Sequence, residues 1–352
     1  MFDKPFRFIH YRFWVSGGVI LPTRTVPALN GRTIRGILFD FGDTLWTRKD
    51  PSIWYREEQA ANCLAVALLR TRIATTHLPA LDDETLGNEV RKELERQIRD
   101  FKRHMPEYEP DFIEMTRLAL QKLGIAGVKL ALARDVYEAL RVHISPSRVP
   151  FPDAFSTLAA LRERGFLLGV VTNRHWGGQS FLDDLRALGF LDYFAPEHIA
   201  ISADLGVRKP NPAIFRYTLN ALGLAPQETV MVGDSLSADV AGAKGMDMIA
   251  VWKPKTHLFA EARAHHRAVR VAQEAVRQEV YALEQAYLEE WEQSANKAEP
   301  LDLESIDDDY LIDYVRSRES KRKQRLYQLM KPDLIIENLS ELLDVFVKVG
   351  LQ

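Results

Sequence analysis

Short apolar runs alternate with helix-length segments over much of the chain. The first run is Gly36 to Phe39, and similar runs follow at Leu167 to Thr172, Ile199 to Ser202, Thr229 to Val232 and Met248 to Val251. Nearly continuous apolar runs of this length are typical of strands that are buried on both faces of a parallel sheet. The segments around these runs have helical periodicity and end before a glycine, a common helix terminator: 155–164, 181–188, 211–222 and 238–244. The pattern predicts an α/β fold built on a parallel sheet.

An all-helical stretch interrupts this alternation directly after the first strand. Helical periodicity with charged opposite faces covers Trp54 to Leu69, Leu86 to Met105, Asp111 to Leu123 and Leu130 to Val142. No strand pattern occurs in this stretch, and prolines at 146, 150 and 152 close it. We therefore expect residues 46–149 to form a helical insert in a core domain that consists of residues 36–45 and 150–253.

The alternation breaks again after residue 253. We expect one helix from His257 to Gln293 and a second from Tyr310 to Met330, which together make 254–331 a helical insertion. The second helix carries a basic cluster: Arg316, Arg318, Lys321, Arg322, Lys323 and Arg325. Either the two helices pack on each other and on the core, or the insertion binds a protein partner or a second copy of the chain. Residues 332–352 then return to the core as a last strand, Leu334 to Ile336, and a final helix, Ser340 to Val347.

Composition and charge narrow the classes of function. A formal net charge of -3 over 352 residues gives no reason to expect nucleic acid or a membrane surface as a partner. The single cysteine, Cys63, cannot form an internal disulfide, and we expect it to pack within a helix of a cytoplasmic protein. No segment has the apolar length that spans a bilayer. Two glycines interrupt the apolar patch Phe13 to Leu21, so we expect residues 1–35 to be an N-terminal extension.

Polar residues follow the predicted strands at the edge where the carboxyl ends of parallel strands meet, which is where open α/β sheets bind ligands. They are Asp40, Thr172, Asn173, Lys209, Asp234 and Asp239. Any one of them alone could be a turn residue or a helix cap. Two carboxylates about 4 Å apart, however, repel by about 4 kcal/mol at an effective dielectric near 20, so Asp40 and Asp234 together call for a cation. An oxygen-only, carboxylate-rich site suits Mg²⁺, which also binds substrate phosphate.

These motifs resemble those of the haloacid dehalogenase (HAD) superfamily of hydrolases, and they occur in that family's order. The segment Phe39-Asp40-Phe41-Gly42-Asp43-Thr44-Leu45 is similar to its first motif, and Val170-Val171-Thr172-Asn173 to its second. Gly206 to Pro210 is similar to the third motif and Gly233 to Asp239 to the fourth. The resemblance implies a HAD-like, Rossmann-like parallel sheet, and the insert after the first motif resembles the helical C1-type cap of subfamily I.

The resemblance also implies roles for the site residues. Asp40 would be the nucleophile that forms an aspartyl-phosphate, and Thr172, Asn173 and Lys209 would bind the phosphoryl group. Mg²⁺ would bind Asp40, the backbone carbonyl of Gly42 and Asp234. Asp239 would support the metal site or Lys209. Together these roles predict a phosphatase that acts on a small phosphorylated metabolite.

One position departs from the family's pattern. Family phosphatases usually carry a second aspartate two residues after the nucleophile, which protonates the leaving group, but this chain has Gly42 there and Asp43 one place later. Loss of a general acid typically costs about 10²–10⁴-fold in rate. We therefore expect a slow phosphatase, or one whose leaving group needs little help, unless Asp43 or a cap residue supplies the proton.

The same departure leaves two other functions open. Haloacid dehalogenases of the superfamily also lack the second aspartate, because halide leaves without a proton. They generally lack the metal-binding aspartate of the fourth motif as well, and the presence of Asp234 here favours the Mg²⁺-dependent phosphatase. A third hypothesis is a catalytically weak scaffold that binds a protein partner through residues 254–331.

Overall fold

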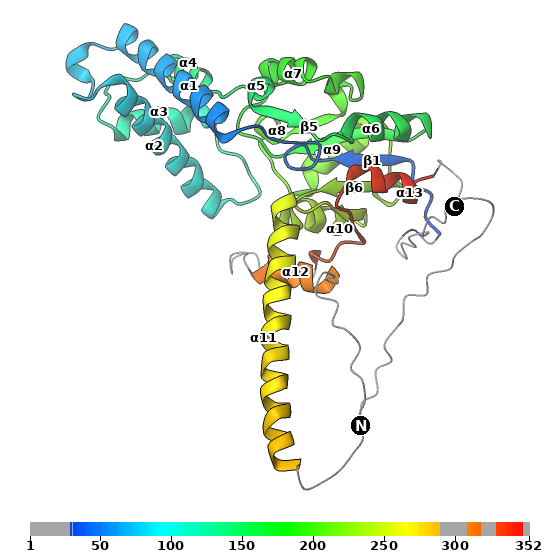
Figure 1. Cartoon of the computed structure of the whole chain (residues 1–352). Coiled ribbons are helices and arrows are strands. Elements are labelled where there is room, and N and C mark those ends of the chain that lie inside the picture. The colour runs from blue at the N-terminus through cyan, green and yellow to red at the C-terminus, as the bar shows by residue number, and fades with distance from the viewer. Residues whose placement is uncertain (1–28, 30, 289–307, 318–328, 348–352) are drawn as a thin grey trace.

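A parallel sheet forms the centre of the molecule. The computed structural model describes residues 29, 31–288, 308–317 and 329–347. In this part of the chain six strands form a sheet in the order β5-β4-β1-β6-β7-β8, and every neighbouring pair is parallel. Figure 1 labels β1, β5 and β6 of this sheet. Their bounds are Gly36–Phe39 for β1, Leu167–Thr172 for β4, Ile199–Ile201 for β5, Thr229–Gly233 for β6, Ile249–Trp252 for β7 and Leu334–Ile335 for β8. The prediction of a parallel α/β sheet is confirmed.

Helices cover both faces of this sheet, which is why its strands are almost uniformly apolar. The helices are α6 (Ala154–Glu163), α7 (Gly178–Ala187), α9 (Pro212–Leu222) and α10 (Ala241–Lys244). Successive side chains of a strand point to opposite faces. Ile37 and Phe39 of β1 accordingly belong to the apolar core that contains residues of α6 and α7, and Leu38 belongs to the core that contains residues of α9 and α10. Asp40 is the first residue after this buried strand.

Four helices of the insert pack around an apolar core of their own (Figure 1). They are α1 (Pro51–Arg72), α2 (Asp83–His104), α3 (Phe112–Lys122) and α4 (Leu130–Ala139). Aspartates begin three of them, because a carboxylate can accept from backbone N–H groups that have no partner within the helix. Asp50 accepts from Ser52, Asp82 from Thr85, and Asp111 from Ile113 and Glu114. Cys63 on α1 is exposed, so the expectation that it packs within the helix is wrong.

A small antiparallel pair of strands joins the two connections between the helical insert and the sheet. β2 (Trp46–Arg48) pairs with β3 (Arg148–Pro150), so the chain leaves the core and returns to it at one place. The sequence did not predict this pair. Each strand has three residues, which is too short for an alternating pattern to be recognised, and the pairing spans about a hundred residues of sequence.

The C-terminal part begins with a long helix that extends away from the sheet (Figure 1). α11 spans Thr256–Leu288 and α12 spans Asp308–Ser317, in agreement with helices predicted in both places. The end of the first predicted helix and the basic residues from 318 onward lie outside the described residues, as does most of the N-terminal extension. The predicted final helix is a 3₁₀ turn, Leu339–Glu341, followed by α13, Leu342–Val345. No described helix, including α11, is long and apolar enough to cross a membrane.

Candidate active site

Asp40 lies at the seam between the two central strands. Its backbone N–H donates to the carbonyl of Val232 on β6 at 2.9 Å, which continues the pairing of β1 with β6 by one residue. The turn that follows is held by Phe41, whose carbonyl accepts from three later backbone N–H groups and whose ring stacks on Trp46 with 4.3 Å between the centroids. Asp40 is buried, with 8% of the residue exposed. It is therefore fixed at the edge of the sheet with its carboxylate facing a cavity.

The loop after β6 brings two more carboxylates to the same place. Asp234 follows the strand directly, and its carbonyl accepts from the indole N–H of Trp252 at 2.8 Å. Asp239 folds back so that its Oδ2 accepts from the backbone N–H of Ser235 at 2.9 Å. A Cβ at Gly233 would lie 2.2 Å from the Asp239 carboxyl carbon, so only glycine fits there. One oxygen from each of Asp40, Asp234 and Asp239 lies within 4.8 Å of the others.

The structure of this loop differs from the helix predicted there. The sequence predicts a regular helix over 238–244, but the structure has a wider turn with π-helical bonding, Leu236–Val240, before α10 begins at Ala241. Such π-turns are frequent at functional sites. Here the wider turn contains Asp239, whose carboxylate reaches back to the start of the loop.

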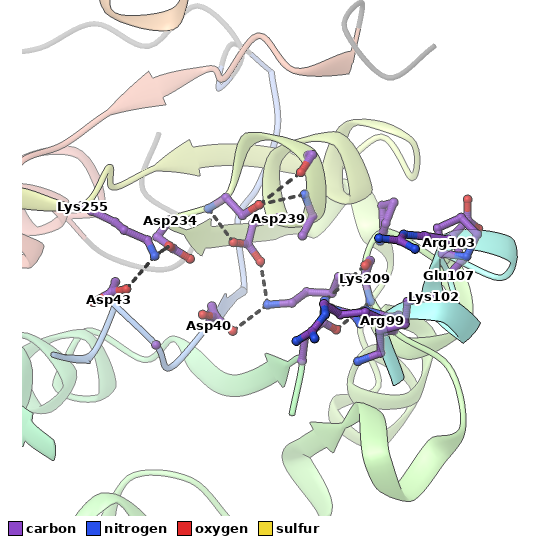
Figure 2. Close-up of a pocket in the computed structure, with 18 residues that line it drawn as sticks. Asp40, Asp43, Arg99, Lys102, Arg103, Glu107, Lys209, Asp234, Asp239 and Lys255 are labelled. Carbon is purple, nitrogen blue, oxygen red and sulfur yellow. Dashed lines mark hydrogen bonds and ion pairs between the residues drawn. The ribbon is translucent and has the colours of Figure 1, made fainter. Parts of the chain in front are cut away.

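Lys209 bridges the carboxylates from the opposite side. Its Nζ lies 2.6 Å from Oδ1 of Asp40 and 2.6 Å from Oδ1 of Asp239 (Figure 2). The same Nζ donates to the carbonyl of Val171 at 2.6 Å. The side chain amide of Asn173 holds the backbone of Lys209 in place: the Lys209 N–H donates to its Oδ1 at 2.8 Å, and its Nδ2 donates to the Lys209 carbonyl at 3.2 Å. Asn173 also lines the cavity, whereas Thr172, 2% exposed, is not among the described residues that line it.

Charge is concentrated at this edge of the sheet. Burial alone would lower the pKa of Lys209, but Asp239 and Asp40 outweigh it and raise that pKa. Burial, followed by the nearby carboxylates of Asp239 and Asp40, raises the pKa of Asp234 well above its usual range. Burial raises the pKa of Asp239 to about 6, although Lys209 opposes the rise. The three clustered carboxylates are thus only partly compensated by Lys209, and their oxygens form a donor set that fits a hard divalent cation.

The residues at positions 42 and 43 also lie at the cavity. Asp43 has a backbone φ of 56°, in the left-handed region that few residues other than glycine adopt and that aspartate tolerates better than most. Its Oδ2 lies 2.9 Å from Nζ of Lys255, which also lies 3.6 Å from Oδ2 of Asp234 (Figure 2). The sequence did not point to Lys255, because it lies outside the four motifs and only the fold brings it beside Asp43.

The cavity lies between the sheet edge and the helical insert and has a volume of about 700 Å³, within the range of small-molecule sites. Asp40, Asp43, Asp234 and Asp239 line one part of it. The end of α2 and the loop after it line another part, with Arg99, Lys102, Arg103 and Glu107 (Figure 2). The structure therefore brings Asp40, Asn173, Lys209, Asp234 and Asp239 together, as the sequence predicts, and adds a basic group from the insert that the sequence did not identify.

Comparisons with known proteins show the family of the chain. Residues 34–247 match the family model described as haloacid dehalogenase-like hydrolase. Glyceraldehyde 3-phosphate phosphatase of Methanopyrus kandleri is 31% identical over 62% of this chain and 83% of that protein. Phosphoserine phosphatase of Thermus thermophilus is 38% identical over 39% of this chain and 51% of that protein. The crystal structure of 2-haloacid dehalogenase from Pseudomonas syringae pv. Tomato DC3000 is 28% identical, with a TM-score of 0.42 over 62% of this chain and 86% of that chain. The chain belongs to the haloacid dehalogenase-like hydrolase family.

Proposed function

We propose that the protein is a Mg²⁺-dependent phosphatase that hydrolyses a small phosphorylated metabolite through an aspartyl-phosphate on Asp40. One observation carries this proposal: the carboxylates of Asp40, Asp234 and Asp239 converge within 4.8 Å, and Lys209 ties two of them together. Phosphatase names among the similar proteins support it. The clustered carboxylates would repel a phosphate monoester unless a divalent cation lies between them, whereas haloacid dehalogenases of the superfamily generally lack the metal-binding aspartate of the fourth motif.

Asp40 is placed to act as the nucleophile. Its backbone is fixed by β6 and its Oδ1 by Lys209, so Oδ2 is left to attack phosphorus. Lys209 keeps Asp40 oriented and offsets the negative charge that develops on the phosphoryl group. Mg²⁺, held by Asp40 and Asp234 with the carbonyl of Gly42, would supply electrostatic stabilisation of the phosphoryl oxygens. Asp239 holds Lys209 from the other side, which makes it a positioning residue.

The leaving oxygen needs a proton, and Asp43 is the candidate donor that we assign. It lines the cavity, one residue after the position that carries the acid in related phosphatases, and its left-handed backbone turns the chain at that point. Asp43→Asn is a suitable test, because asparagine also tolerates the left-handed region. We expect hydrolysis of an alkyl phosphate to slow by about 10²-fold or more and hydrolysis of p-nitrophenyl phosphate, whose leaving group needs little protonation, to change much less.

Phosphate and chloride release measured side by side test the whole proposal. The purified protein is assayed with p-nitrophenyl phosphate and with 2-chloropropionate, each with Mg²⁺ and with EDTA. We expect Mg²⁺-dependent phosphate release, no chloride release, and loss of activity in Asp40→Asn. Chloride release that persists in EDTA would instead identify a dehalogenase, and the absence of both activities would favour a binding scaffold.

A further inference from the structure

The charges that line the cavity are unevenly distributed. On the sheet side, four carboxylates, Asp40, Asp43, Asp234 and Asp239, face two lysines, Lys209 and Lys255. Toward the insert, the charged lining residues are Arg99, Lys102 and Arg103 of α2, the neighbouring Arg208 of the core, and one acid, Glu107. In Figure 2 the labelled basic residues of the insert lie beyond Lys209, on the side away from Asp43 and Asp234. A divalent cation would balance the sheet side and leave the insert side positive.

The positive excess remains when the buried acid behind it is included. Glu109, 7% exposed, lies 2.7 Å from Lys102 and 3.7 Å from Arg208, and it accepts from the hydroxyl of Ser202 at 2.8 Å. Among the lining residues and Glu109, four cations therefore face two carboxylates, which leaves the cavity wall with two positive charges in excess. Two further acids, Glu95 and Asp100, pair with Arg99 and Arg103 but do not line the cavity. Burial, followed by the neighbouring Arg208, lowers the pKa of Lys102 to about 8, although Glu109 opposes this shift.

The helix dipole explains why basic residues occur at the end of α2, but not why they line the cavity. Basic residues are favoured in the last turn of a helix by the helix dipole, and α2 ends at His104. Arg103 pairs with Asp100 at 2.8 Å and Arg99 with Glu95 at 3.4 Å, but these pairs are exposed and such pairs contribute little to stability. The dipole does not require that residues 99, 102 and 103, spaced so that they share one face of the helix, line the cavity of the active site.

We propose that the substrate is a phosphate monoester whose leaving group carries a second anionic group, which Arg99, Lys102, Arg103 and Arg208 bind. This inference rests on the proposed phosphatase function. The transferred phosphoryl group lies against Asp40, and the remainder of the substrate extends past Lys209 toward the end of α2. The second anionic group could be a carboxylate or a phosphate, because guanidinium groups bind both with paired hydrogen bonds.

Matched esters test the proposal. Phosphate release is measured with Mg²⁺ for glycerol 3-phosphate, whose leaving group is neutral, for 3-phosphoglycerate, which adds a carboxylate, and for glycerol 1,3-bisphosphate, which adds a phosphate. We expect kcat/KM to be at least about tenfold higher for one of the anionic esters than for glycerol 3-phosphate, and this preference to shrink as salt screens the charges. Which anionic ester is preferred distinguishes the carboxylate from the second phosphate.

The double variant Arg99→Gln/Arg103→Gln is expected to lower this preference about tenfold or more, mainly through KM for the anionic ester. Both side chains are more than half exposed, so the fold is expected to tolerate the change. Arg96→Gln is the matched control, because Arg96 lies on the same helix and pairs with Glu93 and Asp100 but does not line the cavity. It is expected to leave both the activity and the preference as in the wild type.

The outcomes distinguish failure of the proposed phosphatase function from failure of the inference about the leaving group. If p-nitrophenyl phosphate and all three esters fail to release phosphate, the proposed function is wrong and this inference is wrong with it. If esters are hydrolysed but neutral and anionic leaving groups give equal kcat/KM, the phosphatase stands and the inference is overturned. An equal loss for all three esters in the double variant also overturns it, because the arginines would then serve the transferred phosphoryl group.

Discussion

Gly42→Asp offers a gain-of-function test of how the leaving group is protonated. The backbone φ of Gly42 is not in the positive region, and a Cβ added there would have its nearest contact, Oδ2 of Asp40, at 3.9 Å, an ordinary van der Waals distance. Packing therefore does not require glycine at this position. The substitution would place a carboxyl group beside the nucleophile, where related phosphatases carry their general acid.

The expected gain in kcat follows from the proximity of the introduced carboxyl to Asp40. Two carboxylates about 4 Å apart repel by about 4 kcal/mol at an effective dielectric near 20. This repulsion disfavours the ionised form of the introduced carboxyl and raises its pKa, so a useful fraction stays protonated and can donate. A positioned general acid contributes about 10²–10⁴-fold. Because Asp43 would already supply part of this effect, we expect a gain of about tenfold or more in kcat for an alkyl phosphate.

The assay compares a poor and a good leaving group in three proteins. Phosphate release from glycerol 3-phosphate and from p-nitrophenyl phosphate is measured with Mg²⁺ for the wild type, Gly42→Asp and Gly42→Asn. We expect the gain only for the alkyl ester and only with aspartate, since asparagine has the same shape but is no acid. Equal rates for Gly42→Asp and Gly42→Asn on glycerol 3-phosphate, with p-nitrophenyl phosphate still hydrolysed, would refute this account of the missing acid.

Three further outcomes follow from the geometry. Mg²⁺ should raise the melting temperature, because at one hundred times its Kd it adds about 2.7 kcal/mol to the free energy of unfolding. Asp234→Asn should abolish most of this increase, and an equal increase in the variant would contradict the carboxylate site. Lys209→Met should lower the melting temperature, because losing one partner of a buried ion pair costs about 3–5 kcal/mol, and the loss should be smaller in Lys209→Met/Asp239→Asn. Burial among Phe112 and Trp176 lowers the pKa of His175 to about 3. Below about pH 6.5 the His175 side chain therefore binds a proton in the unfolded chain but not in the folded protein. We expect the melting temperature to fall from pH 7 to pH 5 for this reason, and His175→Phe to make that fall smaller.

The apolar runs in the sequence were enough to predict the strands of the sheet and the residues at their ends. The run from Gly36 to Phe39 is apolar at every position because both faces of β1 are covered, and such a run can be recognised without knowing what covers it. The positions of Asp40, Lys209 and Asp234 relative to these runs predicted that they meet at one edge, which the ion pairs and the carboxylate cluster confirm.

Other features depend on contacts between segments distant in the sequence. The Trp46–Arg48 and Arg148–Pro150 pair is too short to show a period, and the turn at Leu236–Val240 widens where Asp239 folds back to Ser235 and pairs with Lys209. The sequence predicted that Asn173 binds substrate, and the fold shows in addition that its amide holds the backbone of Lys209.

The charge of the cavity was likewise decided only by the tertiary structure. Arg99 and Arg103 read in the sequence as basic residues at a helix end, and nothing local distinguishes them from Arg96, which lies on the same helix away from the cavity. The packing of α2 near the sheet edge selects which of these side chains line the cavity that also contains Asp40. The sequence therefore determined the chemistry of the sheet edge, because it is encoded in contiguous motifs, whereas the surface opposite it results from packing between the insert and the core.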